Sequence, residues 1–312
     1  MAKKQMNKSK IVLLVICIIV FLLSSAFVLK NVISDIKNQK MYDDLSNLVV
    51  ETTNEADGEE VTHAPDYSAV ITENADFVGW ITVPNTSINY PVLQTDDNDF
   101  YLTHGFYKAK DSRGAIFMDY RNNPIDLDAN TIIYGHNCYN TTMFSELTKF
   151  EKLDFYKTTP IIEFNTVERK YQWKIYGVFI TNALPEEDNG YVFNYIYPDM
   201  DGENFEGFIE EVNKRRLYVT DVDIKSDDKM LVLSTCVRNL DIYENGRRTY
   251  KADTRLVVLA RAVRDGESDE VNVNGAYVNT DPKYPQLWYD KNNKSNPYIN
   301  DEKWYPKEVV TE

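Results

Sequence analysis

An uninterrupted apolar segment near the N-terminus constrains this chain more than any other feature. Between Lys10 and Lys30 lie nineteen residues without a charged side chain, IVLLVICIIVFLLSSAFVL. As a helix rising about 1.5 Å per residue, this segment spans about 28 Å, which matches the hydrocarbon core of a bilayer. Residues 11–29 are therefore predicted to form a transmembrane helix.

Charge is distributed unevenly around this segment. The first thirty residues carry five lysines and no acidic group, whereas the rest of the chain carries 29 basic and 49 acidic side chains, a net charge of -20. The positive-inside rule then predicts a cytoplasmic basic tail at residues 1–10 and an extracellular remainder, as in a single-pass protein of the cell membrane. The alternative is a cleaved signal peptide, because Ser24, Ser25 and Ala26 are small, although the apolar run exceeds the usual signal core of about 7 to 15 residues.

Composition excludes several classes of protein. The whole chain has 312 residues, a net charge of -15 and three cysteines. An acidic chain argues against nucleic acid as a partner, since that binding depends on neutralising phosphates with Lys and Arg. Three cysteines cannot form a disulfide framework. The 22 Tyr, 14 Phe and 4 Trp residues are too many for a chain that is disordered throughout.

Beyond the apolar run the sequence changes character twice. Helical spacing of apolar residues over 31–50, followed by an acidic stretch, predicts a helical stalk and a solvated linker at residues 30–66. Residues 67–264 contain short β-rich runs separated by turn formers, which predict a mainly β barrel or sandwich with helical insertions near 141–153 and 202–216. The predicted strands are 80–83, 88–93, 115–120, 131–136, 160–164, 171–180, 221–224, 230–236 and 254–263.

Histidine and cysteine are scarce, and one of each ends a predicted strand. His136 ends TIIYGH, Cys236 ends MLVLSTC, and Arg255 lies at the start of the next strand. If the last two strands pair antiparallel, Cys236 and Arg255 share one rim of the sheet. A cationic neighbour favours a thiolate, an imidazole can protonate a leaving amine, and a guanidinium can stabilise an oxyanion. The pattern indicates thiol-dependent acyl transfer; a solvent-bonded histidine, a buried cysteine and a surface arginine remain the structural alternative.

Seven sequence segments occur in the order and approximate spacing found in sortases. They are Gly79–Ile81, Tyr90–Gln94, Gly114–Asp119, Ile133–Asn137, Met143–Phe144, Leu233–Cys236 and Arg255–Val258. The segment ending in Cys236 resembles the Thr-Leu-x-Thr-Cys signature of that family, with Val232 where threonine is usual. The insertion from Thr181 to Lys229, with its predicted helix, is similar to the long loop that distinguishes class B. Over residues 67–264 the chain therefore resembles a class B sortase.

This resemblance implies a closed β-barrel of about eight strands and a membrane-anchored cysteine transpeptidase, a thiol protease-like enzyme, on the outside of a Gram-positive cell. Cys236 would attack the carbonyl of a threonine in the C-terminal sorting signal of a surface protein and form a thioacyl enzyme. His136 would act first as general acid and then as general base, and Arg255 would stabilise the oxyanion. An amino group of a peptidoglycan precursor or of a pilin lysine would resolve the intermediate, with neither cofactor nor metal.

The resemblance also implies which residues contact the substrate. These are Leu102, Tyr191, Val192, Ser234 and Thr235, with the loop after Thr181 as one wall of the groove. Arg261 has the same side-chain parity as Arg255 and is the second candidate for the arginine role, although the Arg-x-Val-Val pattern favours Arg255. Class B enzymes often have an acidic residue after the cysteine, whereas this chain has Val237, which leaves the substrate preference open.

Cys138 departs from the family pattern and supports two competing hypotheses. With His136 and Cys236 it would supply three ligands of a tetrahedral zinc site, although no fourth ligand is evident in the sequence. An oxidised link between Cys138 and Cys236 would instead silence the enzyme.

Residues 265–312 extend past the region of resemblance. They contain seven large aromatic side chains, Tyr277, Tyr284, Trp288, Tyr289, Tyr298, Trp304 and Tyr305, too many for a passive tail. We expect this extension to cover apolar surface of the barrel; the alternative is a regulatory or partner-binding cover near the groove. Two alternatives for the whole chain also remain, a pilin-polymerising sortase with a lysine acceptor and a catalytically silent peptide-binding module.

Overall fold

The computed structural model describes residues 8–51, 64–200 and 202–307. The chain divides into two compact units, Met1–Asn47 and Leu48–Glu312. Most of the predicted basic tail and of the predicted acidic linker lies outside the described residues.

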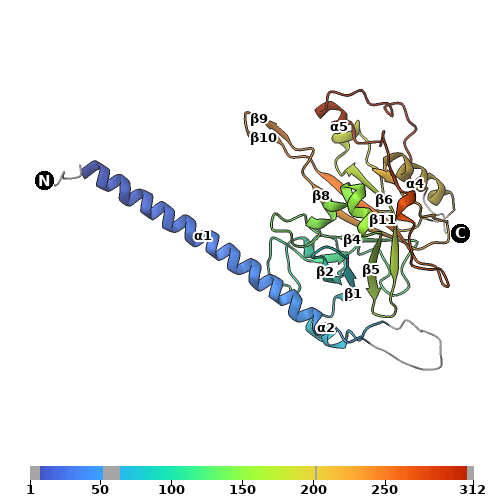
Figure 1. Cartoon of the computed structure of the whole chain (residues 1–312), viewed down its shortest axis with the longest axis horizontal. Helices are drawn as coiled ribbons and strands as arrows, with labels where there is room; N and C mark the ends of the chain where they lie inside the picture. The colour runs from blue at the N-terminus through green and yellow to red at the C-terminus, as the bar shows by residue number, and fades with distance from the viewer. Residues whose placement is uncertain (1–7, 52–63, 201, 308–312) are drawn as a thin grey trace. The chain divides into compact units, whose positions relative to one another are not determined.

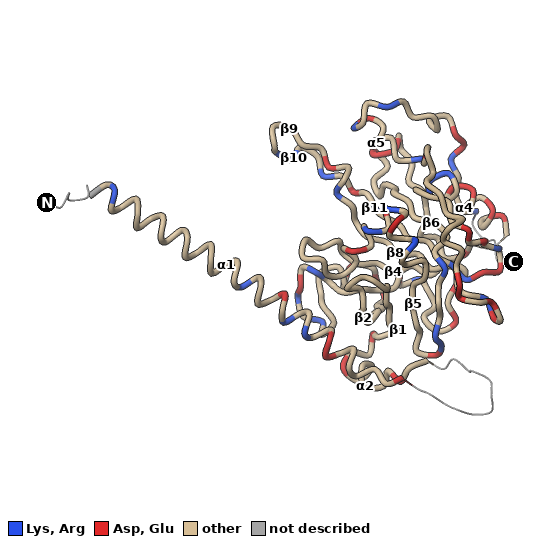
Figure 2. Tube along the Cα trace, in the orientation of Figure 1, with Lys and Arg blue, Asp and Glu red and all other residues tan. Residues whose placement is uncertain are grey.

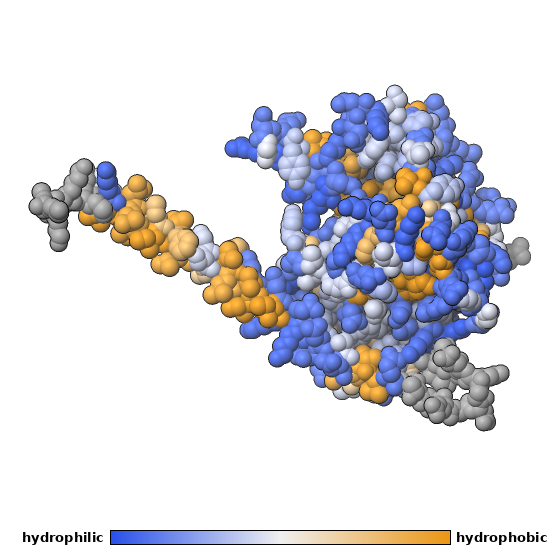
Figure 3. Space-filling model, in the orientation of Figure 1, coloured by the Kyte–Doolittle hydropathy of each residue, from blue (hydrophilic) through white to orange (hydrophobic). Residues whose placement is uncertain are grey.

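The described residues of the first unit form the helix α1 (Lys8–Ser46) (Figure 1). The prediction that the helix continues beyond the apolar run is therefore confirmed. Charged side chains are absent from its apolar stretch (Figure 2), and the surface of that stretch is hydrophobic (Figure 3). Among the described residues, α1 is the helix that is long and apolar enough to cross a membrane, by length and composition; a signal sequence would meet the same criteria.

The second unit is built around a closed barrel of eight strands in the order β1-β2-β3-β4-β8-β11-β6-β5 (Figure 1). The strands are β1 (Phe77–Thr82), β2 (Asn89–Leu93), β3 (Ile116–Met118), β4 (Asn130–Tyr134), β5 (Ile161–Thr166), β6 (Gln172–Asn182), β8 (Met230–Val237) and β11 (Thr254–Ala262). Neighbours pair antiparallel except β2 with β3 and β4 with β8, which are parallel. The predicted mainly β fold with a closed eight-stranded barrel is confirmed.

Shorter elements surround the barrel. Two small sheets pair β9 (Ile242–Glu244) with β10 (Arg247–Tyr250) and β7 (Tyr218–Val219) with β12 (Tyr277–Val278). The α-helices are α2 (Ser68–Glu73), α3 (Leu153–Thr158), α4 (Gly202–Arg215) and α5 (Gln286–Lys291), and the 3-10 helices are η1 (Phe100–Leu102), η2 (Ser145–Glu151), η3 (Pro185–Asp188) and η4 (Val273–Gly275). Of these, α4 lies beside β6 and covers the outside of the barrel (Figure 1).

Two local predictions need correction. The helix expected at 141–153 begins later, as the 3-10 helix η2, and is followed by α3. The strand expected at 221–224 is wrong, because these residues lie outside any strand. Their alternation of polar and apolar residues has another cause: Val222 is buried, whereas the carboxylate of Asp223 binds Arg261 and Arg264.

The strands β4, β8 and β11 form the part of the barrel that carries the site. Successive side chains of a strand point to opposite faces. On one face Ile132, Val232 and Val257 pack into an apolar layer with Phe193 and Phe208. Because Phe208 belongs to α4, this face is the outside of the barrel, and the alternate residues of the same strands point into its interior.

Candidate active site

The pairing of β8 with β11 brings a cysteine and an arginine together. In this antiparallel ladder Cys236 lies directly opposite Arg255, so both side chains leave the same face of the sheet. The sequence-based expectation that these two residues share a rim is confirmed. Both side chains are partly exposed, and they continue the outer face that carries Val232 and Val257.

The parallel pairing of β4 with β8 adds the histidine. Tyr134 is the register partner of Ser234, and one residue further the hydroxyl of Thr235 donates to the carbonyl of Gly135, at 2.8 Å. Continuing this register by one more residue sets His136 beside Cys236. The side-chain amide of Asn137 donates to the carbonyl of Cys236 at 2.8 Å and fixes the two strand ends to each other. Three adjacent strands therefore present His136, Cys236 and Arg255 in a row.

The imidazole of His136 is held by a backbone carbonyl of η1. Its Nε2 lies 2.8 Å from the carbonyl oxygen of Leu102, at the end of η1. A carbonyl oxygen only accepts, so Nε2 carries the hydrogen and Nδ1 is left to exchange a proton. Gly114, with a φ of +62°, lies under the ring, and a Cβ there would come within 2.4 Å of the Tyr101 carbonyl and 3.2 Å of the imidazole. The glycine is thus required by both backbone conformation and space.

The guanidinium of Arg255 is held by a carboxylate from its own strand end. Its Nη1 lies 2.5 Å from Asp253, and the Arg255 side chain is 24% exposed. Burial lowers the pKa of Arg255, but the Asp253 bond and the nearby Cys236 and Tyr195 raise it, so the net pKa lies above its ordinary value. The guanidinium therefore stays charged at any working pH.

A buried glutamate holds the backbone of Asp253 in turn. Glu187, in η3, accepts hydrogen bonds from the backbone N–H of Asp253 at 2.7 Å and from the hydroxyl of Tyr250 at 3.0 Å. Burial raises the pKa of Glu187, although these two hydrogen bonds oppose the shift. Sequence reasoning missed both Glu187 and Asp253, because neither belongs to a motif and their relation depends on a loop folding back onto a strand end.

The predicted substrate contacts lie around this row of three residues. Ser234 and Thr235 are buried, and the hydroxyl of Ser234 is 2.9 Å from that of Tyr195. Burial raises the pKa of Tyr195, whereas the charge of Arg255 and the hydrogen bond with Ser234 lower it. Sequence reasoning did not single out Tyr195.

The other predicted contacts lie on two loops. Leu102 reaches His136 through its carbonyl, and its side chain is partly exposed. Tyr191 is buried and Val192 is partly exposed in the insertion after β6, but the hydroxyl of Tyr191 donates to the carbonyl of Trp304 in the C-terminal extension. The structure thus brings Ser234 and Leu102 to the row and places the phenol of Tyr191 against the extension.

Comparison with known proteins identifies the family. The sortase domain matches residues 81–263, more than half of the chain. Sortase B of Listeria monocytogenes is 37% identical over 174 residues, which are 56% of this chain and 68% of that protein. This chain belongs to the sortase family, in class B.

Further relatives agree with this assignment. Sortase B of Staphylococcus aureus is 33% identical over 201 residues, covering 64% of this sortase and 75% of that protein. A structure described as a Staphylococcus aureus sortase B–substrate complex has a TM-score of 0.54 and 34% identity, over 63% of this sortase and 84% of that chain. Membership of the family makes the protein a transpeptidase.

Cys138 of this sortase lies two residues after His136. Among the described residues, no group of three His, Cys, Asp or Glu side chains is placed to hold a metal ion, so the geometry gives no support to the zinc hypothesis for Cys138, His136 and Cys236. The three cysteines are free, and the link between Cys138 and Cys236 is not formed. Burial raises the pKa of Cys138, although the Thr142 hydroxyl and nearby arginines oppose this shift.

Arg261 serves a different purpose from Arg255. Its side chain is 1% exposed at the other end of β11, and its guanidinium binds the carboxylates of Asp223 and Glu267 at 2.8 Å and 2.6 Å. Lys174 binds the same Glu267 at 2.7 Å. Together with the backbone carbonyls of Asp223 and Ala262, these carboxylates accept all five hydrogen bonds that Arg261 can donate, so the second candidate for the arginine role is a structural residue.

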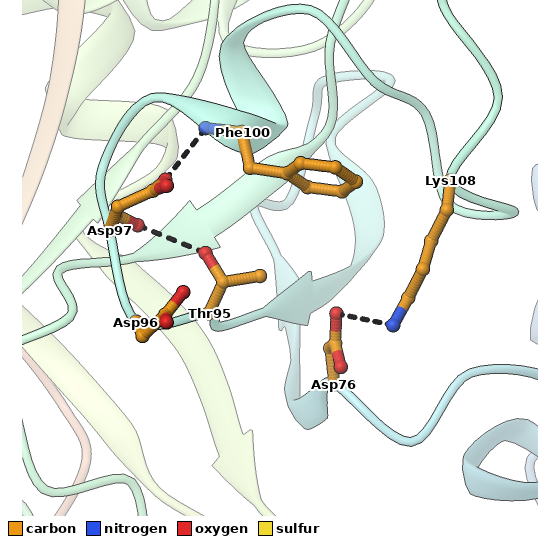
Figure 4. A pocket seen from close by; sticks show the side chains of 6 residues that line it. All are labelled: Asp76, Thr95, Asp96, Asp97, Phe100 and Lys108. Carbon is orange, nitrogen blue, oxygen red and sulfur yellow. Dashed lines mark hydrogen bonds and ion pairs between the residues drawn. The ribbon is translucent and has the colours of Figure 1, made fainter.

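A polar pocket lies beside Phe100 of η1 (Figure 4). Its volume is about 390 Å³, and it is lined by Asp76, Thr95, Asp96, Asp97, Phe100 and Lys108. The carboxylate of Asp97 accepts hydrogen bonds from the backbone N–H groups of Asp99 and Phe100 and so stabilises the start of η1. The carboxylate of Asp76 forms an ion pair with Lys108 at 2.8 Å. These carboxylates stabilise the loop that supports His136.

Proposed function

We propose that this sortase is anchored to the cell membrane by α1 and joins surface proteins to an amino group of a cell-wall precursor outside the cell. Its substrates would be proteins with a C-terminal sorting signal, cleaved after a threonine. The apolar length of α1, the lysines that precede it and the acidic domain that follows support this orientation. The juxtaposition of His136, Cys236 and Arg255 on three adjacent strands carries the proposal for the chemistry.

In the first half-reaction the thiolate of Cys236 attacks the threonine carbonyl. The new S–C bond gives a tetrahedral oxyanion, which the permanently charged guanidinium of Arg255 stabilises. When the C–N bond breaks, Nδ1 of the His136 imidazolium gives its proton to the leaving amine. The products are a thioacyl enzyme with a neutral His136 and the released C-terminal segment.

In the second half-reaction the direction of proton transfer reverses. An incoming amine attacks the thioacyl carbonyl and gives a proton to Nδ1 of His136, a new C–N bond forms, and the S–C bond breaks to return the thiolate of Cys236. The bond from Nε2 to the Leu102 carbonyl keeps the ring in one tautomer through both steps. Neither step requires a cofactor.

We further propose that the sorting peptide lies along the outer face of β4 and β8, over Ser234, whereas Thr235 alternates to the interior face and would support the groove from beneath. Leu102 would border it on one side and the insertion after β6, with Tyr191 and Val192, on the other. Since the hydroxyl of Ser234 is already hydrogen-bonded to Tyr195, we expect Ser234 to shape the groove rather than to bind peptide through its side chain. Thr235, whose hydroxyl donates to the Gly135 carbonyl, would hold β8 against β4.

The test incubates the full chain in detergent micelles with a library of sorting-signal peptides. Intact-mass and peptide-level spectrometry should find a thioacyl adduct on Cys236, and hydroxylamine should release it. The matched control is Cys138→Ser, which removes a neighbouring thiol and should leave the adduct unchanged. If no peptide gives an adduct on Cys236 that Cys236→Ala abolishes, the enzymatic proposal is wrong and the silent peptide-binding module remains.

The acceptor is identified in a second stage. The isolated thioacyl enzyme is offered either a wall-type cross-bridge peptide amine or a lysine side chain in a pilin-derived peptide. Faster resolution by the cross-bridge amine supports wall anchoring. Faster resolution by the lysine peptide overturns that part of the proposal in favour of pilin polymerisation.

A further inference from the structure

Part of the C-terminal extension packs along the loop that would form one wall of the proposed active-site groove. We define the wall as residues 184–195, which include η3, and the strap as residues 283–307, which include α5. We propose that the strap is a positioning device: it fixes the wall and thereby sets the affinity of the groove for its substrate. This inference rests on the proposed function for the identity of the groove.

The indole of Trp304 makes the central contact of the strap. Its ring packs against Phe193 of the wall, with centroids 5.8 Å apart, and against Phe208 of α4, at 6.0 Å. Gly207 lies beneath it, since a Cβ there would come within 2.2 Å of the indole nitrogen. A glycine inside a helix costs stability, so its presence in α4 is explained by the room that Trp304 needs.

Hydrogen bonds tie the same part of the strap to the wall and to α4. The hydroxyl of Tyr191 donates to the carbonyl of Trp304 at 2.9 Å, and the Tyr191 ring meets that of Tyr305 edge-on at 5.6 Å. The side chain of Asn204 binds Lys307 twice, accepting from its backbone N–H at 2.7 Å and donating to its carbonyl at 3.1 Å. This end of the strap is held in a single register.

The other end of the strap contacts the first part of the wall. The backbone N–H of Gln286, at the start of α5, donates to Asp188 of η3 at 2.9 Å. Lys283 is buried and binds Glu211 of α4 at 3.2 Å, and Glu211 in turn binds Arg215, whose guanidinium lies 4.5 Å above the ring of Phe193. Both ends of the wall are therefore fixed by the strap, directly or through α4.

Two residues of the wall link these contacts to the row of His136, Cys236 and Arg255. Next to Asp188, Glu187 holds the backbone of Asp253, which pairs with Arg255. Two residues after Phe193, Tyr195 holds the hydroxyl of Ser234 beside Cys236. A wall that moves would displace both the groove lining and the support of the catalytic arginine, so the effect of the strap should reach substrate binding and not only stability.

The test uses the full chain in detergent micelles and four variants. Trp304→Ala removes the central contact, and Trp304→Phe restores an aromatic ring. Gly207→Ala displaces the indole by adding one methyl group while favouring the helix, so it tests the contact without creating a cavity. Tyr277→Ala is the matched control, since this tyrosine belongs to the same extension but is 61% exposed outside the strap.

Two readouts are measured. Hydrogen–deuterium exchange of residues 184–195 should rise in Trp304→Ala and Gly207→Ala while β8 stays protected, and it needs no activity. With a peptide that acylates Cys236, KM should rise about threefold to tenfold at a kcat within about twofold of the unaltered chain, the effect expected from losing an aromatic contact. Trp304→Phe should restore at least half of each effect, and Tyr277→Ala should show none.

The outcomes separate the two proposals. If Trp304→Ala and Gly207→Ala lower the melting temperature but leave exchange of the wall and KM unchanged, the strap is only a cover and the inference is wrong. An effect of Tyr277→Ala as large as that of Trp304→Ala also overturns it. If the unaltered chain acylates with no peptide, the proposed function fails, and exchange of the wall alone then decides whether the strap fixes it.

Discussion

Substituting each of the two arginines of β11 should separate an effect on turnover from an effect on thermal stability. Arg255→Met and Arg261→Met each keep an unbranched apolar stem of similar length and remove the guanidinium. In Arg255→Met the lost ion pair involves Asp253, whose side chain is 40% exposed. An exposed pair contributes about 0 to 1 kcal/mol, so the folded state should be nearly as stable as before. The chemical step loses its oxyanion partner, which should slow turnover by about 10²- to 10³-fold.

Arg261→Met should have the opposite effect. Its guanidinium is buried and serves Asp223, which is 57% exposed, and Glu267, which is 25% exposed. Removing one partner of a buried pair costs about 3 to 5 kcal/mol, and because water can reach both carboxylates we expect the lower end, about 3 kcal/mol. At about 2 to 4 °C per kcal/mol for a domain of this size, the melting temperature should fall by about 6 to 12 °C.

Differential scanning calorimetry and peptide turnover, both on the full chain at the same pH, measure the two effects. Turnover by Arg261→Met is taken well below its melting temperature and should stay within about threefold of the unaltered chain, because Arg261 touches no reacting group. The reasoning is refuted if Arg255→Met retains turnover, or if Arg261→Met loses it while keeping its melting temperature. The first result would remove Arg255 from the chemistry, and the second would assign Arg261 to it.

Three further predictions concern single side chains. Cys138→Ser should leave turnover unchanged and Cys236→Ser should abolish it, as measured with a fluorogenic peptide; loss of activity in Cys138→Ser would support a functional metal at this site, and a gain would support the inhibitory link to Cys236. Asp253→Asn should reduce turnover about threefold at an unchanged melting temperature, because Arg255 loses a partly exposed charge partner; a larger loss in thermal stability than in rate would contradict this. Hydrogen bonds from Arg261 and Lys174 hold the pKa of Glu267 below its ordinary value of 4.5, although burial opposes them. The contribution of Glu267 to the stability of the folded state is therefore complete above pH 4.5, and it is lost as the pH falls towards the lower, folded-state pKa. Melting temperature measured between pH 7 and pH 3 should therefore decline below about 4.5, and less steeply in Glu267→Gln.

Much of the architecture was predictable from local patterns. The signals for these elements are local, since an apolar run, an alternating β segment or a turn former involves only neighbouring residues. The sequence therefore predicted α1, the barrel strands and α4 close to where they lie. The failures are informative in the same terms. Residues 221–224 alternate like a strand, yet Asp223 is polar because it binds two arginines from a distant strand end, and periodicity cannot distinguish these two causes.

In the candidate site too, the sequence predicted some residues and missed others. Strand ends and motif resemblance singled out His136, Cys236 and Arg255, and the antiparallel pairing of consecutive strands even predicted that two of them meet. The partners Asp253, Glu187 and Tyr195 were not found, since each acts through one or two hydrogen bonds across a loop closure. No spacing in the sequence encodes such a closure.

The sequence by itself determined that this protein has one membrane-length helix, an acidic domain of short strands, and a scarce histidine and cysteine at strand ends. Only the tertiary structure decided that Arg261 is buried in an ion network, and that Trp304 of the extension packs against Phe193 and Phe208. The physical reason is that hydrophobic periodicity is a local property of the chain. Register across the barrel and the packing of Trp304 over Gly207 are set by residues about a hundred positions apart, which meet only once the chain has folded.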